Sequence, residues 1–400
     1  MATPPLAPLV LRKGEDRRLR TGHSWIFSNE IDTARTPLTG FEPGQAALIL
    51  DQASKPLGTG YVNPHSLICA RLVSRDPDYV LGKSLLVHRV QVAQSLRQRV
   101  FAEPYYRLVF GDSDGLPGLV LDQFGDTVVA QISTAGMERV KDDIVAAVTK
   151  VIKPACLIFR NDSSSRSFEG LELYTETALG NAPAQLTVRE NGAQFQVAGL
   201  TGQKTGWFYD HRLNRQRMAA YVEGKRVLDV FSYAGAWGIQ AARAGAQEIW
   251  CVDASEPALE SVRTNAELNG VGERVRTVAG DAFDILKQLR QERAHFDVVI
   301  LDPPAFIRRK KDLEAGTDAY RRLNQAAMQV LEKDGVLVSA SCSSYLSRDV
   351  LRNVLLASSR HVDRFLQILE QGHQGPDHPV HPAISETDYL KAFICRVLPT

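Results

Sequence analysis

A predicted strand runs directly into a predicted helix in the stretch RVLDVFSYAGAWG, residues 226–238. Small residues in the turn let the backbone approach a ligand closely before the helix begins. The dinucleotide fingerprint GxGxxG is absent, because only Gly235 and Gly238 occur, and this disfavours a nicotinamide or flavin site. The stretch predicts a strand-to-helix turn at the ligand-binding edge of a sheet.

Strands and helices alternate on the C-terminal side of this stretch. Short β-branched runs at residues 226–230, 248–253, 275–279, 298–302 and 335–341 are separated by helical patterns. This alternation is typical of a parallel, doubly wound sheet. A hairpin around Asn191-Gly192 precedes it, and residues 365–369 and 393–397 are expected to form an antiparallel edge pair.

The N-terminal part differs in character, so we expect a multidomain protein. Residues 1–78 predict a small all-β barrel with strands at 46–50, 58–62 and 68–72. Residues 79–185 predict a central α+β unit, with helices at 81–101 and 137–151 and strands at 119–122, 127–133 and 155–160. Residues 186–400 form the predicted C-terminal α/β, Rossmann-like domain.

Composition excludes several classes of protein. The 400 residues carry 47 basic and 46 acidic side chains, so net charge gives no nucleic-acid signature. Basic clusters occur only locally, at residues 12–20 and 308–311. The five cysteines are far apart, which argues against disulfides and a zinc site and for a reducing compartment. We expect a cytoplasmic protein with no transmembrane helix, secretory signal or metal.

Acidic residues follow successive predicted strands. Asp253 lies 24 residues after Asp229 and could accept both hydroxyl hydrogens of a ribose, whereas Asp281 could accept from an adenine amino group. Each acid could instead be a helix N-cap or a turn residue. Together they predict a pocket for an adenosyl group that carries no phosphate.

The fourth and fifth strands end in residues suited to chemistry on a base. Asp302 precedes two prolines, which stiffen the turn and fix the direction of the carboxylate toward the polar edge of a flipped base. Cys342 follows the fifth strand among hydroxyl side chains and could act as a nucleophile if its pKa is lowered. The alternatives are a structural Pro-Pro turn and a buried cysteine.

These segments resemble those of a class I S-adenosylmethionine-dependent methyltransferase. More narrowly, the whole chain resembles the RlmI-type family of large-subunit (23S) rRNA cytosine-C5 methyltransferases. The resemblance rests on a PUA-like barrel, the middle unit and four further segments, namely residues 203–212, 302–306, 341–343 and 377–391.

The resemblance implies a role for individual residues. Asp302 and Cys342 would face the cytosine as catalytic residues, and the PUA-like unit would contact RNA. The residues that would bind S-adenosylmethionine are Gln203, Thr205, Arg212, Asp229, Phe231, Tyr233, Gly235, Asp253, Asp281, Ala282 and Asp302. Among them, Arg212 would meet the methionine carboxylate, Asp253 the ribose and Asp281 the adenine.

The implied reaction is methyl transfer to cytosine carbon 5 after addition of a cysteine to carbon 6. Many related enzymes carry a second cysteine beside the paired prolines, where this chain has Ala305, so the group that removes the carbon 5 proton stays open. Two alternatives also stay open: a related rRNA guanine N-methyltransferase, which needs no thiol, and a catalytically silent RNA-binding assembly factor. The sequence identifies neither the modified nucleotide nor the oligomeric state, for which a homodimer is one candidate.

Overall fold

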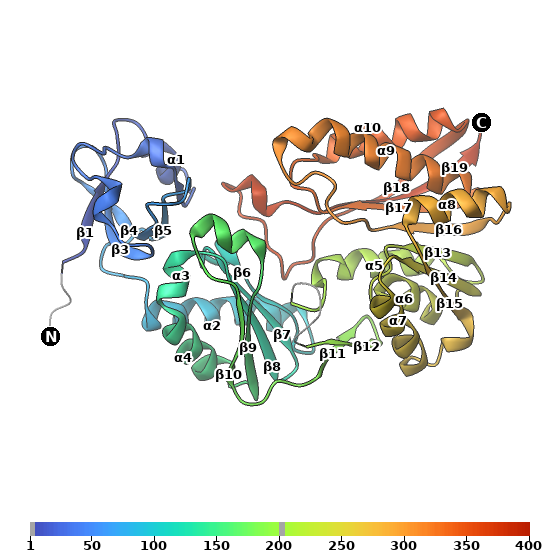
Figure 1. Cartoon of the computed structure of the whole chain (residues 1–400), viewed down its shortest axis with the longest axis horizontal. Coiled ribbons are helices and arrows are strands. Elements are labelled where there is room, and N and C mark those ends of the chain that lie inside the picture. Colours follow the sequence, from blue (N-terminus) through green and yellow to red (C-terminus); the bar gives the residue numbers. More distant parts are fainter. Residues whose placement is uncertain (1–4, 200–204) are drawn as a thin grey trace. The chain divides into compact units, whose positions relative to one another are not determined.

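The computed structural model describes residues 5–199 and 205–400 and contains two compact units (Figure 1). The first unit consists of the chain up to Leu186, with the segments Ala198–Trp207 and Pro376–Thr387. The second consists of Thr187–Val197, Phe208–Gly375 and Asp388–Thr400. Gln203 lies outside the described residues.

The first unit begins with a five-stranded sheet in the order β1-β3-β4-β5-β2. Its strands are β1 (Ala7–Val10), β2 (Trp25–Ile26), β3 (Gln45–Leu50), β4 (Pro56–Val62) and β5 (Ala70–Ser74), with the short helix α1 (Arg17–Arg20). The predicted all-β character is confirmed, although the strand expected at 68–72 begins two residues later. Its core contains Leu9, Ile49 and Val62.

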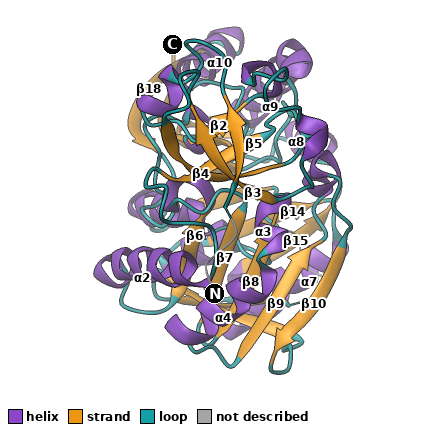
Figure 2. Cartoon of the chain, turned by 90° about the vertical axis from the view of Figure 1, so that its left-hand side faces the viewer, coloured by secondary structure: helices purple, strands orange, loops and turns teal. Residues whose placement is uncertain are grey.

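A second five-stranded sheet of this unit has the order β10-β9-β8-β7-β6. Its strands are β6 (Tyr105–Phe110), β7 (Leu119–Phe124), β8 (Thr127–Ile132), β9 (Cys156–Asn161) and β10 (Tyr174–Leu179). Figures 1 and 2 both show α2 (Lys83–Val100) beside α4 (Lys141–Val151), and the two helices pack on each other.

The prediction of one continuous helix at 137–151 is wrong. The structure has two helices, α3 (Ala135–Arg139) and α4, separated at Val140. The first lies against the N-terminal sheet, where Gly136 has no room for a side chain because a Cβ would meet the ring of Tyr61 at 2.1 Å. The second packs on α2, so the two helices dock on different partners.

The segment Pro376–Thr387 is built into the first unit although it comes late in the chain. Arg97 is fully buried, and its guanidinium pairs with Asp114 at 2.7 Å and donates to the carbonyl oxygen of Asp377 at 2.8 Å. The Asp377 carboxylate in turn accepts from the Arg107 amide at 3.1 Å. These contacts compensate a charge that would otherwise be costly to bury.

The second unit contains a seven-stranded sheet in the order β15-β14-β13-β16-β17-β19-β18. The strands are β13 (Arg226–Val230), β14 (Glu248–Asp253), β15 (Val275–Ala279), β16 (Phe296–Leu301), β17 (Leu331–Ser341), β18 (Arg364–Gly372) and β19 (Lys391–Pro399). The first five are parallel, and β19 is antiparallel to both β17 and β18, which confirms the predicted edge pair. The hairpin β11 (Gln185–Glu190) and β12 (Ala193–Ala198) forms a separate two-stranded sheet.

Helices cover both faces of the seven-stranded sheet, which explains the largely apolar runs of its central strands, such as β16. In Figure 1, α9 and α10 lie on one side of it, and α6 and α7 lie on the other. The helices are α5 (Arg212–Met218), α6 (Ala236–Arg243), α7 (Glu256–Leu268), α8 (Ala282–Gln291), α9 (Leu313–Gln329) and α10 (Arg348–His361). The core between them includes Leu228, Val299 and Leu337.

Within residues 5–199 and 205–400, no helix is both long and apolar enough to cross a bilayer.

Candidate active site

The carboxyl ends of five parallel strands lie along one edge of the seven-stranded sheet. Asp253 is the last residue of β14, Asp302 directly follows β16, and Cys342 directly follows β17. The direction of the strand order reverses at β13, and ligands of open α/β sheets bind at such a reversal. The structure therefore gathers the predicted residues at the edge where a ligand is expected.

The loop after β13 has an uncommon backbone conformation. Phe231 and Tyr233 have φ angles of 67° and 48°, and Gly235 has a φ of 83°. Non-glycine residues in this left-handed region are strained and concentrate at functional sites. At Gly238 a Cβ would lie 2.7 Å from the Cys251 sulfur, so only glycine lets α6 pack this close to the sheet.

Asp229 is completely buried beneath this loop. Its Oδ2 accepts a hydrogen bond from the Gly238 amide at 2.9 Å, whereas Oδ1 has no hydrogen-bond partner among the described residues. The pKa of Asp229 is raised to about 7, mainly by burial; the Gly238 amide opposes this rise, and the nearby charges of Asp302 and Asp253 add to it. Asp302 and Asp253 are thus close enough for their charges to oppose the ionisation of Asp229, which favours a ligand with positive charge.

Asp253 and Asp281 both bind backbone amides. Asp253 accepts from the amides of Tyr233 and Ser255, each at 2.9 Å. Asp281 is exposed and is the N-cap of α8, where its Oδ1 accepts from the Phe283 amide at 2.8 Å. The N-cap alternative is therefore correct for Asp281, whose Oδ1 also accepts from the Asp284 amide at 3.3 Å. Ala282, the first residue of α8, is buried.

Two partners orient the Asp302 carboxylate. Trp237 Nε1 donates to Oδ2 at 3.0 Å, and His211 Nε2 lies 3.2 Å from Oδ1. Burial alone would raise the pKa of Asp302, but the facing His211 holds it below its usual value. Burial would likewise lower the pKa of His211, and Asp302 raises it above its ordinary value instead. Asp302 is therefore ionised and fixed in direction.

The tautomer of His211 follows from its second nitrogen. Nδ1 lies 3.2 Å from the side-chain amide nitrogen of Asn214, which also donates to the His373 carbonyl oxygen at 3.2 Å. Because this amide nitrogen is a donor, we assign His211 Nδ1 as the acceptor and the proton of the neutral ring to Nε2, the nitrogen that lies 3.2 Å from Asp302.

A network of hydroxyl groups holds the loop that carries Cys342. The Tyr320 hydroxyl contacts Ser341 Oγ at 2.8 Å and Ser343 Oγ at 3.0 Å. Ser343 Oγ also accepts from the Ile307 amide at 3.3 Å, which ties this loop to the one that follows Asp302. Cys342 itself is half-buried, whereas the other four cysteines are buried.

Three further residues, Arg212, Thr205 and Gln203, are predicted to bind the cofactor. Arg212 begins α5 and is buried, with its guanidinium over the Tyr209 ring and Nε 3.6 Å from Glu190. Thr205 belongs to the first unit, where its hydroxyl donates to Asp122 at 2.6 Å. Their roles toward a cofactor, like that of Gln203, stay predictions.

Sequence reasoning did not assign roles to His211 and Trp237. His211 lies within the segment 203–212 that carries the resemblance, and Trp237 lies within the loop quoted at the outset. Their places in these two segments were the signal that the sequence offered. Only the three-dimensional structure shows that both meet Asp302.

Two family models match the chain. A PUA-like domain matches residues 9–75, and an S-adenosylmethionine-dependent methyltransferase matches residues 173–396. Ribosomal RNA large subunit methyltransferase I of Photobacterium profundum is 36% identical over 97% of this chain and 99% of its own length. The same protein of Erwinia tasmaniensis is 36% identical over 98% and 99%. The chain belongs to the ribosomal RNA large subunit methyltransferase I family.

Solved structures agree with this family in fold. SMU.776, described as a methyltransferase complexed with SAH, has a TM-score of 0.83 at 22% identity and covers 98% of this chain and 100% of its own. A methyltransferase from Streptococcus mutans gives 0.82 with the same coverage. The predicted multidomain fold, with a PUA-like domain and a Rossmann-like methyltransferase domain, is confirmed.

The cofactor of this methyltransferase is S-adenosylmethionine, and the residues at the strand ends fit it. Asp229 Oδ1 and Ser232 Oγ are buried polar atoms without a hydrogen-bond partner among the described residues, so the loop has capacity for a polar ligand. The crowded carboxylates suit a molecule that carries both an ammonium and a sulfonium group.

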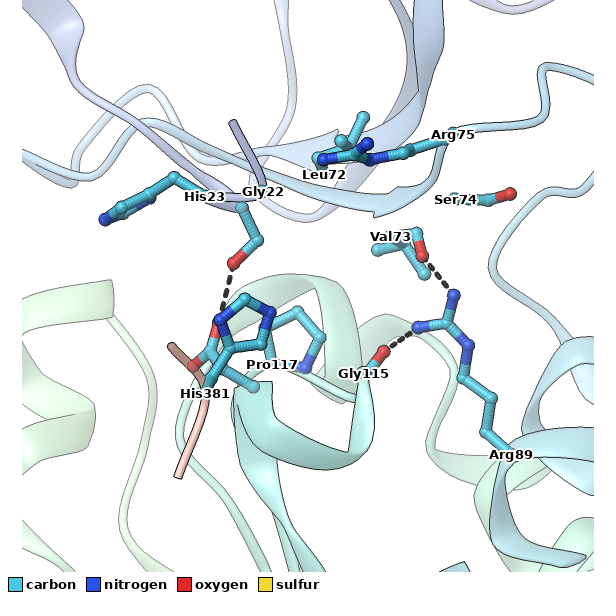
Figure 3. Close-up of a pocket in the computed structure, with 12 residues that line it drawn as sticks. Gly22, His23, Leu72, Val73, Ser74, Arg75, Arg89, Gly115, Pro117 and His381 are labelled. Atoms are coloured by element: carbon cyan, nitrogen blue, oxygen red, sulfur yellow. Dashed lines mark hydrogen bonds between the residues drawn. The ribbon is translucent and has the colours of Figure 1, made fainter. Parts of the chain in front are cut away.

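A cavity of about 220 Å³ lies elsewhere, in the first unit (Figure 3). There Ser24 donates to Asp112 at 2.9 Å, and Arg89 donates to the carbonyl oxygens of Val73 and Gly115. Arg89 of α2 thus links β5 to the connection between β6 and β7. Asp253, Asp302 and Cys342 are not among the residues that line this cavity.

Proposed function

We propose that this protein methylates carbon 5 of a cytosine in 23S rRNA through a covalent adduct between Cys342 and carbon 6 of the base. The observation that carries the proposal is the position of Cys342, half-buried at the carboxyl end of β17 in a loop tied to the one after Asp302. The names of the relatives support ribosomal RNA of the large subunit as the substrate.

Cys342 differs from the other cysteines in accessibility. Burial raises the pKa of Cys69 and of Cys395 to about 12, and it also raises the pKa of Cys156 and of Cys251. A thiol with a raised pKa that is shielded from solvent is a poor nucleophile at neutral pH. Cys342 is therefore the cysteine best placed to attack a base.

The chemistry requires a nucleophile because carbon 5 of cytosine is weakly nucleophilic. Addition of the thiolate forms a bond from sulfur to carbon 6 and moves the electron pair of the carbon 5–carbon 6 double bond toward carbon 5. S-adenosylmethionine supplies an electrophilic methyl group when it is bound. Loss of the carbon 5 proton to a base then re-forms the double bond and expels the thiolate.

Asp302 would hold the cytosine at its polar edge. An ionised carboxylate fixed by Trp237 and His211 can accept from the exocyclic amino group and orient the ring over Cys342. The imidazole proton beside it can be passed to charge that develops on the base. These are the roles that we propose for the two residues.

RNA binding would fall to the PUA-like unit. Lys13 and Arg17 are exposed, whereas Arg12 donates to the Ile31 carbonyl oxygen at 2.9 Å and Arg18 pairs with Glu30 at 2.7 Å. Lys13 and Arg17 are thus the better candidates for phosphate contacts. Five free cysteines and an RNA substrate favour the cytoplasm as the location.

Release of tritium from RNA that contains cytosine labelled at carbon 5 tests this proposal directly. We expect the protein and S-adenosylmethionine to release tritium, Cys342→Ala to release none, and Cys156→Ala to behave as the wild type. RNA with 5-fluorocytosine should trap the adduct, because fluorine cannot leave as a proton. Methyl incorporation without tritium release, retained in Cys342→Ala, would refute the cytosine reaction and favour methylation of guanine.

A further inference from the structure

Lys391 is a buried cation beside the loop that carries Cys342. It is the first residue of β19 and lies opposite Ser341, the last residue of β17, in the antiparallel pair. Its exposed fraction is only 4%. A lysine with so little contact with water needs acceptors or an anion nearby.

Lys391 meets the residues on both sides of Cys342. The ammonium donates to the Ser343 carbonyl oxygen at 2.7 Å, so it reaches from opposite Ser341 across to the residue after Cys342. The charged groups that act on it are Asp388, Cys342 and Arg348. Of these, Cys342 is the group at the candidate active site that can become an anion.

We propose that Lys391 is a positioning residue that holds Cys342 as a thiolate by placing an ammonium group beside it. The step that this thiolate would serve, addition to a base, rests on the function proposed above. The charge pairing itself concerns only two side chains of the free protein.

The electrostatics give this pairing a definite pH range. Burial lowers the pKa of Lys391 to about 8, whereas Asp388 and Cys342 raise it and Arg348 lowers it. Below about pH 8 the Lys391 ammonium is charged and favours the thiolate form of Cys342. Above about pH 8 Lys391 is neutral and no longer stabilises the thiolate. The side chains of Tyr320 and Cys342 also interact, since the charge of Cys342 raises the pKa of the Tyr320 hydroxyl, which burial raises most. An opposite charge within about 4–6 Å shifts a pKa by about 1–3 units.

Alkylation of Cys342 by iodoacetamide, followed against pH and read from the mass of the labelled peptide, measures the thiolate without RNA or methyl donor. We expect Lys391→Met to slow labelling at neutral pH by about tenfold and Lys391→Arg to restore most of the rate. Lys333→Met removes an exposed lysine of β17 and should change nothing. An unchanged rate and pH profile in Lys391→Met would overturn the proposal.

A second variant covers the case in which Lys391→Met does not fold. Asp388 is exposed and supports the ammonium, so Asp388→Asn should slow labelling by about twofold near pH 8. Faster labelling in that variant would contradict the pairing. The tritium assay keeps the two proposals apart. If alkylation of Cys342 depends on Lys391 but Cys342→Ala still methylates RNA, only the proposed cytosine reaction is refuted.

Discussion

Substitution of Asp229 by asparagine should stabilise the second unit increasingly as the pH rises, while it weakens cofactor binding. The pKa of Asp229 is raised from 3.8 to about 7, so the folded protein holds this proton more tightly than the unfolded chain does. Stability is therefore lost as the pH rises from 3.8 toward 7 and is level above that. Asparagine does not titrate, and its oxygen can still accept from the Gly238 amide.

The magnitude follows from about 1.4 kcal/mol per pKa unit. The carboxylate destabilises the folded state by about 2 kcal/mol near pH 5.5 and by about 4 kcal/mol near pH 8.5. The difference in the free energy of unfolding between Asp229→Asn and the wild type should thus grow by about 2 kcal/mol from pH 5.5 to pH 8.5. For a domain of this size the gain corresponds to about 4–8 °C in Tm.

Scanning calorimetry of both proteins at the two pH values measures this difference. Asp284→Asn, which removes an exposed carboxylate of α8, is the matched control and should leave the pH dependence unchanged. Isothermal titration should show at least about tenfold weaker binding of S-adenosylmethionine to Asp229→Asn, since a charge-assisted contact is lost. The reasoning is refuted if the Tm difference between variant and wild type is the same at both pH values.

Three further predictions concern the base and the RNA. Cys342→Ser should abolish turnover but keep cofactor affinity in titration calorimetry, and a large loss of affinity would show a structural role. His211→Gln should move the acid limb of the pH–rate profile upward by about one unit, because burial then raises the pKa of Asp302 with the Trp237 hydrogen bond as the remaining opposition. An unmoved limb would show that His211 does not set it. Changing Lys13 and Arg17 together to alanine should weaken RNA binding and make its salt dependence shallower, whereas an unchanged slope would place the RNA elsewhere.

The doubly wound sheet could be predicted from sequence because its strands are short runs of buried β-branched residues. β13, β14 and β15 have the predicted bounds, and β16 differs only in starting at Phe296 and ending before Asp302. β6 was not predicted. Its run includes Arg107, whose guanidinium pairs with Asp122 of β7 at 2.8 and 2.9 Å, and this compensation appears only once the two strands lie side by side.

Part of the candidate site could also be predicted from the sequence. Residues at the ends of parallel strands must meet at one edge, so Asp253, Asp302 and Cys342 were accessible to sequence reasoning. His211 and Lys391 were not assigned roles, because each acts on a residue far away in the chain. His211 meets Asp302, and Lys391 meets the loop after Ser341, only through the packing of α5 and the pairing of β19 with β17.

The late segment Pro376–Thr387 constrains how the protein can be made and divided. Because Asp377 completes the environment of the buried Arg97, a ribosome must synthesise nearly the whole polypeptide before the N-terminal unit has all its parts. Until then the Arg97 guanidinium has Asp114 and the Arg107 carbonyl oxygen as partners but lacks the Asp377 carbonyl oxygen. A fragment that ends before the segment should consequently be prone to proteolysis around α2.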